Sequence, residues 1–359
     1  MIYIIFGLIV AALIVYLIFR QKKKPAGEEY FIVPEGMSKE RVKKLGLDKA
    51  SENVSYILNP SKLSFPKIDE TPDDVEYKPD EEMDFVINIK SSGPHSFKKD
   101  DLWQMFDKDW RMNFGAAQIF GYSSEERRWT YVIAGGTPDL YDKVQVAITL
   151  LGIPDENHSF NDTKSLDRYI RELSKKMSNY PTKVELEFTE TVEHAVSRGK
   201  KLLELRTGFG IDSIIILKSD KVYNGRLAWD ALQSVGLVWG DGDLFHWSNN
   251  ENYGHDQHFS VWTSTDPGYF FPENIKAGSM NPGDLIFGFV VPRSADPKNV
   301  FTAMLDAVKY CQSRLGGTII AKDGGIFNEI KEKQELDDLI EKMKTEGLTP
   351  GSKRALRMF

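Results

Sequence analysis

Residues 236–246 read GLVWGDGDLFH, and the interpretation of the fold depends on this stretch. Gly240 and Gly242 alternate with Asp241 and Asp243, a composition that permits a tight turn. The Leu-Phe pair that follows is typical of a β-strand entering an apolar core. The stretch therefore predicts a turn that leads directly into a buried strand.

Strands and helices alternate on both sides of this turn. Strands are expected at residues 214–217, 243–245, 259–263, 285–291 and 318–321, and helices at 227–235, 300–315 and 328–343. Neighbouring strands combined with long helices are typical of an α+β domain. Its helices are expected to cover one face of an antiparallel sheet and leave the other accessible. We assign residues 209–346 to this domain, called the second unit, and residues 347–359 to a basic tail.

An earlier part of the chain, residues 83–208, follows the same order and is called the first unit. Strands are expected at 85–89, 118–120, 129–134, 144–151 and 184–188, and helices at 100–106, 166–177 and 192–205. Phe97 and Trp103 have the same separation as Tyr223 and Trp229. Such paired positions favour a degenerate tandem duplication, although any two α+β domains share a rough order of elements. The first unit is then a spacer or a second, diverged contact surface.

Residues 20–82 are predicted to form a flexible linker. Prolines recur along it, and a dense group of Asp and Glu residues closes it between Asp69 and Glu82. Proline removes backbone donors and like charges repel each other, so the segment is expected to stay extended. Within it, Ser38 can act as the N-cap of a short helix at 38–47.

The chain opens with the uncharged run MIYIIFGLIVAALIVYLIF, residues 1–19. A helix of this length spans about 28 Å, close to the thickness of the hydrocarbon core of a bilayer. A secretory signal peptide would need a basic segment before a shorter apolar run, and a small-residue cleavage site after it. Residues 1–19 are therefore expected to be a single transmembrane anchor in the inner membrane. Arg20 and residues 22–24 follow it, and the positive-inside rule then places the N-terminus in the periplasm and the body in the cytoplasm.

Two features of the composition restrict the function. The formal net charge of −7 argues against general affinity for nucleic acid. The single cysteine, Cys311, excludes a disulfide within the chain, as expected in a reducing compartment.

Candidate catalytic residues are few. His255 and His258, with His246 upstream, form the densest histidine cluster, but residues 249–254 read as a loop, so no helix fixes the spacing of the pair. The sequence also lacks the common nucleophile, zinc-protease, phosphate-loop and dinucleotide motifs. We therefore expect no enzyme, no cofactor and no metal, and keep a metal-dependent enzyme using these three histidines as an alternative.

The opening stretch belongs to an ordered series of motifs that resembles the C-terminal domain of the ZipA family of bacterial division proteins. The series comprises residues 214–217, 224–225, 236–246, 267–270, 282–283, 291–292, 301–317 and 328–344. It covers about residues 211–345. The layout of an apolar N-terminal helix, a basic flank and a linker before this domain is also similar to the family.

The resemblance implies a binding module rather than an enzyme. In the family, one sheet face packs on helices and the other offers an apolar cleft to the C-terminal peptide of FtsZ, the tubulin-like division protein. The positions carried over from the family are Ile214, Ile216, Gly242, Leu244, Trp262, Ser264 and Phe287. Period-two spacing places each pair on one side of its strand.

This chain departs from the family pattern at several cleft positions. Gly242 and Ser264 stand where the family often has methionine, and Asp266 stands where it can have a basic residue. One extra residue near Phe287 leaves Gly288 or Phe289 as alternatives, because a one-residue shift exchanges the two faces of a strand. The resemblance implies a membrane tether for FtsZ at the division site, and a membrane-anchored adaptor of the same fold with a different peptide partner is the alternative.

Overall fold

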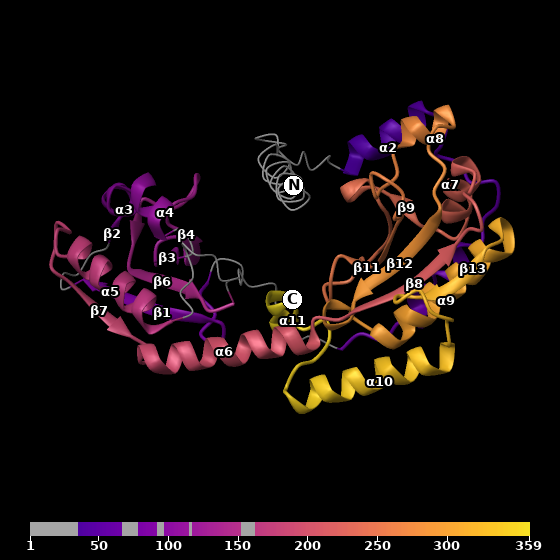
Figure 1. The fold of residues 1–359 in the computed structure, drawn as a ribbon. Coiled ribbons are helices and arrows are strands. Elements are labelled where there is room, and N and C mark those ends of the chain that lie inside the picture. The colour runs from indigo at the N-terminus through magenta and orange to yellow at the C-terminus, as the bar shows by residue number, and fades with distance from the viewer. Residues whose placement is uncertain (1–34, 67–77, 92–96, 115–116, 152–161) are drawn as a thin grey trace, which may run out of the picture.

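The structure is a computed structural model that describes residues 35–66, 78–91, 97–114, 117–151 and 162–359. The predicted anchor at residues 1–19 lies outside these ranges. Within them, none of the helices combines the length and the hydropathy needed to cross a bilayer. Figure 1 shows two lobes with separate sheets, which correspond to the two predicted units and are joined by the long helix α6 (Val192–Phe209).

The first unit contains a five-stranded antiparallel sheet in the order β4-β3-β6-β1-β7. Its strands are β1 (Asp84–Ser91), β3 (Ala117–Ser123), β4 (Arg128–Tyr131), β6 (Lys143–Thr149) and β7 (Val184–Phe188). Its other elements are α3 (Lys99–Met105), α4 (Lys108–Phe114), α5 (Thr163–Met177) and the small pair β2 (Phe97–Lys98) and β5 (Leu140–Tyr141). The sheet and α5 enclose one apolar core.

The second unit contains a six-stranded sheet in the order β13-β8-β12-β11-β10-β9, antiparallel throughout. Its strands are β8 (Asp212–Lys218), β9 (Val238–Trp239), β10 (Phe245–Ser248), β11 (Gln257–Trp262), β12 (Asp284–Val290) and β13 (Thr318–Ala321). Its helices are α7 (Gly225–Ser234), α8 (Pro272–Ala277), α9 (Pro297–Leu315) and α10 (Glu329–Thr345), with short 3-10 turns η4 (Asp241–Asp243) and η5 (Val291–Arg293).

Capping residues fix where the long helices begin. The Asp296 carboxylate accepts a hydrogen bond from the Asn299 amide at the start of α9, and Asn328 accepts from the first amides of α10. In the first unit the Asp162 side chain caps α5 in the same way. These residues satisfy amide groups that have no partner inside the helix, so each helix starts at a defined position.

The sheet of the second unit has one packed face and one free face. On β8, Ile215 and Leu217 are fully buried, whereas Ile214 and Ile216 point the other way and are only partly buried. Helix α9 packs on the buried side, and α7 packs on α9 (Figure 1). The prediction of a mixed α+β protein with antiparallel sheets is confirmed.

The predicted flexible linker is wrong for residues 35–66, which we call the docked segment. It contains α2 (Glu35–Lys44) and the 3-10 turns η1 (Ser55–Ile57) and η2 (Pro60–Lys62), and it packs on the second unit. Its buried residues Val42, Leu47 and Leu58 belong to the core of that unit. The predicted short helix exists but starts earlier, so Ser38 lies inside α2 and is not its N-cap.

Polar contacts hold the docked segment along its length. Trp229 donates its indole N–H to the Leu47 carbonyl at 3.0 Å. The Arg41 guanidinium binds both carboxylate oxygens of Glu273 at 2.6 and 2.7 Å and lies over the Trp239 ring. The Val54 amide also donates to the Ser234 carbonyl at 2.9 Å, so part of the segment's backbone is satisfied against the domain instead of against water.

The predicted basic tail is also part of the fold, since it contains α11 (Lys353–Met358) and contacts both units. Arg357 pairs with Asp80 at 2.8 Å and with Asp84 at 3.3 Å. Burial raises the pKa of Asp84, which is almost inaccessible to solvent. On the other side, the Tyr253 hydroxyl donates to the Pro350 carbonyl at 2.6 Å. The tail therefore connects the two units.

Candidate functional site

Two rows of side chains cross the free face of the second-unit sheet. The strand register places Trp262, Ile286, Ile216 and Ile320 side by side in one row. The same register places Ser260, Gly288 and Ile214 side by side in the next row. All of these side chains except the buried Gly288 are partly exposed. The first row is thus an apolar strip across four strands.

The Trp262 ring lies over Gly288 at the middle of this face. A Cβ atom at position 288 would lie 2.7 Å from Cη2 of Trp262 and 3.1 Å from Cγ1 of Ile214. Real carbon atoms do not approach so closely, so a larger residue would displace the indole. Gly288 therefore allows Trp262 to lie flat against the sheet.

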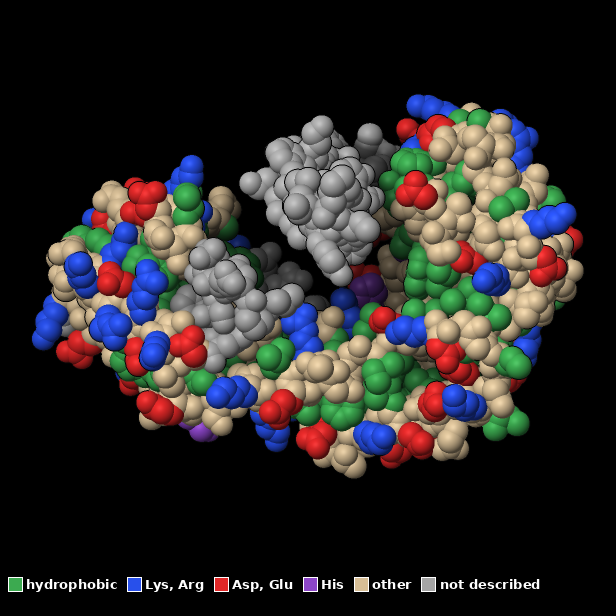
Figure 2. All heavy atoms as spheres, in the orientation of Figure 1, with side chains coloured by type: hydrophobic (Ala, Val, Ile, Leu, Met, Phe, Trp, Pro, Cys, Tyr) green, Lys and Arg blue, Asp and Glu red, His purple; other side chains and the backbone are tan. Residues whose placement is uncertain are grey.

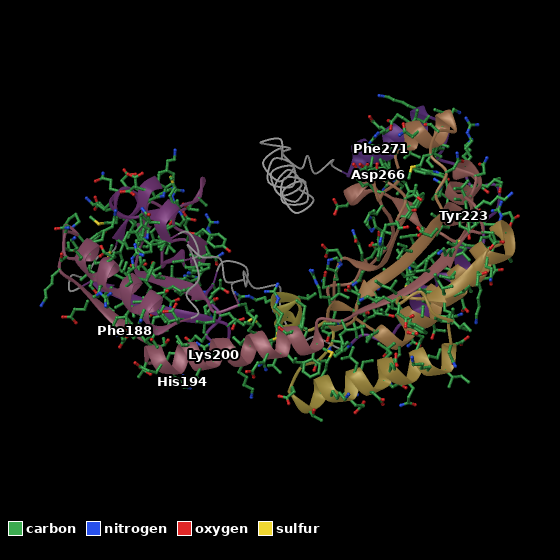
Figure 3. The ribbon with its side chains drawn as sticks, in the orientation of Figure 1. Phe188, His194, Lys200, Tyr223, Asp266 and Phe271 are labelled. Atoms are coloured by element: carbon green, nitrogen blue, oxygen red, sulfur yellow. The ribbon has the colours of Figure 1, made fainter. Side chains whose placement is uncertain are left out.

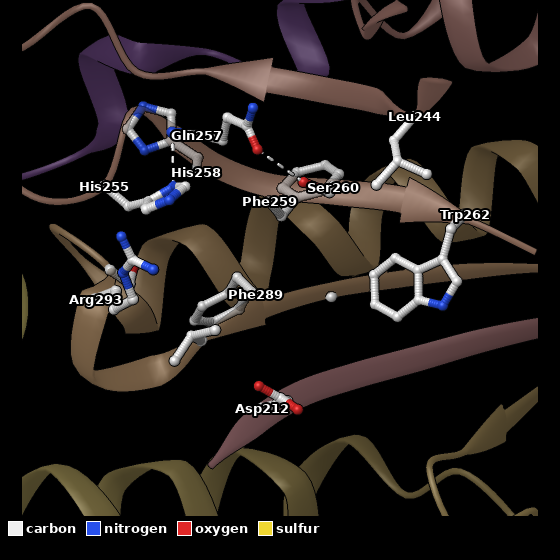
Figure 4. A pocket seen from close by; sticks show the side chains of 13 residues that line it. Asp212, Leu244, His255, Gln257, His258, Phe259, Ser260, Trp262, Phe289 and Arg293 are labelled. Carbon is white, nitrogen blue, oxygen red and sulfur yellow. Dashed lines mark hydrogen bonds between the residues drawn. The ribbon is translucent and has the colours of Figure 1, made fainter. Parts of the chain in front are cut away.

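A cavity of about 250 Å³ opens on the same face, between Trp262 and the end of the sheet where β11 begins and β12 ends (Figure 4). Its apolar side is formed by Leu244, Phe259, Trp262, Phe289 and Val290. Its polar end is formed by His255, His258, Arg293 and Ser294. In Figure 2 a histidine side chain lies beside charged side chains on the side of the second unit that faces the first. The site is therefore apolar at one end and rich in polar groups at the other.

The structure places the predicted cleft residues unequally. Ile214, Ile216 and Trp262 share the free face, and Leu244 lines the cavity. Gly242 lies in the turn η4 with a positive φ of 63°, next to Leu244 rather than on a strand. Ser264 follows the end of β11, where its amide and its hydroxyl both donate to the Asp284 carboxylate.

Phe287 is a wrong assignment. It is 0% exposed and pairs across the strands with Ile215 and Val261, which belong to the core. The alternative residue Gly288 is the one on the free face, and Phe289 lines the cavity from its edge. The physical reason is the one-residue shift: β12 is apolar on both faces, so its sequence does not indicate which face is which.

Of the three clustered histidines, His246 lies on β10, His258 lies on β11, and His255 lies in the loop before β11. His246 Nε2 donates to the Asp241 carbonyl at 2.7 Å, and its Nδ1 is 2.8 Å from the Ser260 hydroxyl. Burial lowers the pKa of His246, which keeps its ring neutral. In the described part of the chain, no group of three or more His, Cys, Asp and Glu side chains is arranged to hold a metal.

His258 is buried next to two aromatic rings. Its ring centroid lies 4.5 Å from that of Trp247 and 6.3 Å from that of Phe65 in the docked segment. Burial lowers its pKa to about 4, and burial together with the nearby Arg293 charge lowers the pKa of His255. Both rings are therefore neutral near pH 7 and can act as hydrogen-bond partners rather than as charges.

Sequence reasoning did not identify several residues of this face. Ile286 belongs to the apolar strip, and the alternation of β12 would have located it if the register had been known. Arg293 and Ser294 come from the turn after β12, and His255 comes from the loop before β11. No sequence pattern links these three, because the fold alone brings them to one cavity.

Comparison with known proteins agrees with this geometry. Residues 211–338 match the family model described as "ZipA, C-terminal FtsZ-binding domain". The cell division protein ZipA of Marinobacter nauticus is 27% identical over 105 residues, which cover 29% of this chain and 30% of that protein. The alignment thus spans less than a third of the relative. The resemblance read from the sequence is confirmed for residues 211–338.

Proposed function

Because residues 211–338 form a ZipA-like domain, we propose that the chain is a cell-division protein that binds the C-terminal peptide of FtsZ. The peptide lies on the free face of the second-unit sheet. Its apolar side chains contact the strip of Trp262, Ile286 and Ile216, and they reach the cavity beside Leu244. The protein acts by binding and carries out no chemical step.

The observation that carries this proposal is the partly exposed apolar strip on a face that no described helix covers. An apolar surface of this kind gains free energy when a peptide removes it from water, at about 25 cal/mol per Å² of apolar area. Amphipathic peptides commonly dock in such grooves, and tryptophan is enriched among the residues that dominate binding. Trp262 is therefore the main anchor residue.

The uncharged residues 1–19 serve as a single-pass inner-membrane anchor in this proposal, with the folded units in the cytoplasm at the division site. The docked segment changes the geometry of the tether, because residues 20–34 are all that separates the anchor from it. Even fully extended, this stretch reaches at most about 50 Å, whereas residues 20–82 would reach about 210 Å. The peptide-binding face therefore stays close to the bilayer. Many weak contacts along one filament then add through their high effective concentration.

A fluorescently labelled FtsZ C-terminal peptide tests this proposal by anisotropy, with the full chain in detergent. We expect Trp262→Ala to weaken binding at least about tenfold, since truncation of a central tryptophan commonly costs 2 kcal/mol or more. Trp103→Ala is the matched control in the first unit and should leave the affinity unchanged. Absence of binding to the wild-type chain would contradict the proposal.

An adaptor for a different peptide is the second candidate, and the position of Trp262 favours it. The indole occupies the middle of the face, which leaves a narrower groove than small side chains would. If the FtsZ peptide fails to bind, a peptide-library selection on the wild-type chain and on Trp262→Ala tests whether the chain binds a different peptide on this face. Enrichment of a common peptide only by the wild-type chain would identify an adaptor that uses the same face.

A further inference from the structure

The polar end of the cavity contains three buried polar atoms that have no hydrogen-bond partner among the described residues. They are Nδ1 of His258, Nε of Arg293 and Oγ of Ser294, and all three residues line the same cavity. His258 is 3% exposed and Ser294 is 4% exposed. Buried polar atoms are nearly always paired in native proteins, so three around one cavity indicate a site built for a polar ligand group.

Hydrogen-bond donors dominate this group. Arg293 can only donate. His255 accepts the Gln257 amide at its Nδ1 at 3.2 Å, so in its neutral form Nε2 carries the proton and donates. The Ser294 hydroxyl can donate as well. The one carboxylate that lines the cavity, Asp212, lies 3.7 Å from the ammonium of Lys322. The complement of such a set is an anion with several acceptor positions.

The hydrogen-bond donors of the cavity and the acidic Asp266 lie at opposite ends of β11. Arg293 and His255 lie where the strand begins, whereas Asp266 follows its other end, close to α8 (Figures 3 and 4). The strand is six residues long, so its two ends are separated by roughly 20 Å. An acidic ligand group therefore finds hydrogen-bond donors at one end of the face and an acidic side chain at the other.

We propose that Arg293, Ser294, His255 and His258 bind a carboxylate of the peptide whose apolar side chains contact Trp262 and Ile216. This inference rests on the proposed function and adds the orientation of the peptide, with its carboxylate at the β11 start and its apolar residues toward Trp262. The carboxylate belongs to an acidic side chain or to the peptide C-terminus. A cavity of about 250 Å³ suits one such group rather than a whole ligand.

Three forms of the FtsZ C-terminal peptide test the proposal: the unmodified peptide, one with its acidic side chains changed to amides, and one with an amidated C-terminus. We expect one of the two modified forms to bind the wild-type chain about tenfold more weakly, and this form identifies the source of the carboxylate. Arg293→Gln should weaken the binding of the unmodified peptide to a similar extent. It should not further weaken the binding of the modified form that already binds less tightly. If the three forms bind equally, the carboxylate site is wrong while peptide binding stands.

Matched variants separate recognition from folding. Ser294→Ala removes a buried hydroxyl that has no partner, so it should keep the melting temperature and weaken the unmodified peptide about threefold. Arg293→Lys should retain part of the affinity, because it keeps the charge and loses the planar fork. Arg127→Gln, an exposed position in the first unit, makes the same charge change and should have no effect. The proposal would be overturned if Ser294→Ala and Arg293→Gln both bound the unmodified peptide as tightly as the wild-type chain does.

Acetate provides a readout that does not depend on the FtsZ peptide. Nuclear magnetic resonance should show saturable shifts of the Arg293 Nε–H and His258 ring signals when sodium acetate replaces sodium chloride at constant ionic strength. The shifts of the His258 ring signals should be absent in Arg293→Gln. If no peptide form binds, the proposed function fails, and the acetate titration alone decides whether the carboxylate site exists. Shifts that do not saturate, or that equal those in chloride, would reject it.

Discussion

The two units share the arrangement of three adjacent strands at one edge of the sheet and differ outside them. The order β7-β1-β6 in the first unit corresponds to β13-β8-β12 in the second, all antiparallel, and a long helix precedes the outer strand in each (α5 and α9). Beyond this trio the sheets diverge. In the first unit β6 pairs with β3, which precedes its hairpin partner β4, whereas in the second unit β12 pairs with β11, which follows its partner β10.

The two sheets also differ in how they use a glycine next to an aromatic ring. Both sheets contain a glycine beneath an aromatic ring, Gly121 under Tyr141 and Gly288 under Trp262. Tyr141 is fully buried in the core, whereas Trp262 is partly exposed on the free face. A glycine under an aromatic ring thus belongs to the core in the first unit and to an accessible surface in the second. The match to the family model covers only the second of them.

The docked segment explains another contrast between the units. Trp103 and Trp229 occupy the positions paired by sequence spacing, but Trp103 is 43% exposed and Trp229 is 2% exposed. The Trp229 indole donates to Leu47 of the docked segment, while the Trp103 indole donates to Val132 of its own unit. A common origin of the two units stays a prediction, since the shared order of three strands is also compatible with independent α+β domains.

Removal of the docked segment should have the largest effect and should separate the units most clearly. Deleting residues 35–66 removes three buried apolar side chains and leaves the Trp229 N–H without its acceptor. We expect the second unit to lose more than about 5 kcal/mol of unfolding free energy. Hydrogen exchange resolved by peptide measures this. A synthetic 35–66 peptide added in trans should restore protection, and equal protection in the deleted and intact chains would show that the segment is not part of the domain.

Acid should destabilise the second unit before the first. Burial lowers the pKa of His258 from about 6.5 when unfolded to about 4 when folded, although Asp296 opposes the shift. The unfolded state therefore binds the proton first, and stability present above pH 6.5 is lost as the pH falls toward 4. The loss amounts to about 3 kcal/mol. His258→Gln should remove this part of the pH dependence in urea titrations. An unchanged pH dependence in His258→Gln would contradict the assignment.

Alanine substitutions at Gly121 and Gly288 should have the smallest effect on stability, and this effect should differ between the two units. A Cβ at position 121 would meet the Tyr141 ring at 2.3 Å, and that ring is enclosed by the core. Gly121→Ala is therefore expected to cost about 2–3 kcal/mol. Gly288→Ala should cost about 1 kcal/mol, because the partly exposed indole can rotate away, and it should change the tryptophan fluorescence and weaken peptide binding. Thermal unfolding followed by circular dichroism measures both losses of stability. A larger loss in Gly288→Ala than in Gly121→Ala would contradict the prediction.

Much of the fold follows from local patterns. The strands β7 and β13 begin and end at the predicted residues, and the long helices follow their apolar periodicity and caps. The short elements α4, α8, β2, β5 and β9 were missed, because so few residues carry little periodic signal. Docking of residues 35–66 was missed for a different reason, since the Leu47 carbonyl that receives the Trp229 N–H is a backbone group that any residue would supply.

The candidate site was predictable only in part. Ile214, Ile216 and Trp262 were carried over from the family pattern, and alternation along β8 correctly placed Ile214 and Ile216 on one side of that strand. Phe287 failed because LIFGF at 285–289 is apolar on both faces, and the register depends on pairing with β8 and β11. The cluster at Arg293 could not be inferred, because its residues come from separate loops that meet only in the folded sheet.

The central claim is that the free face of the second unit captures the FtsZ C-terminal peptide. Nuclear magnetic resonance on the isotopically labelled full chain, titrated with that peptide to saturation, tests it most directly. The account predicts saturable shifts in the Trp262 indole and in the methyl groups of Ile214, Ile216 and Ile286, with the first unit unchanged. A spectrum without shifts, or with shifts confined to residues 83–208, would contradict it.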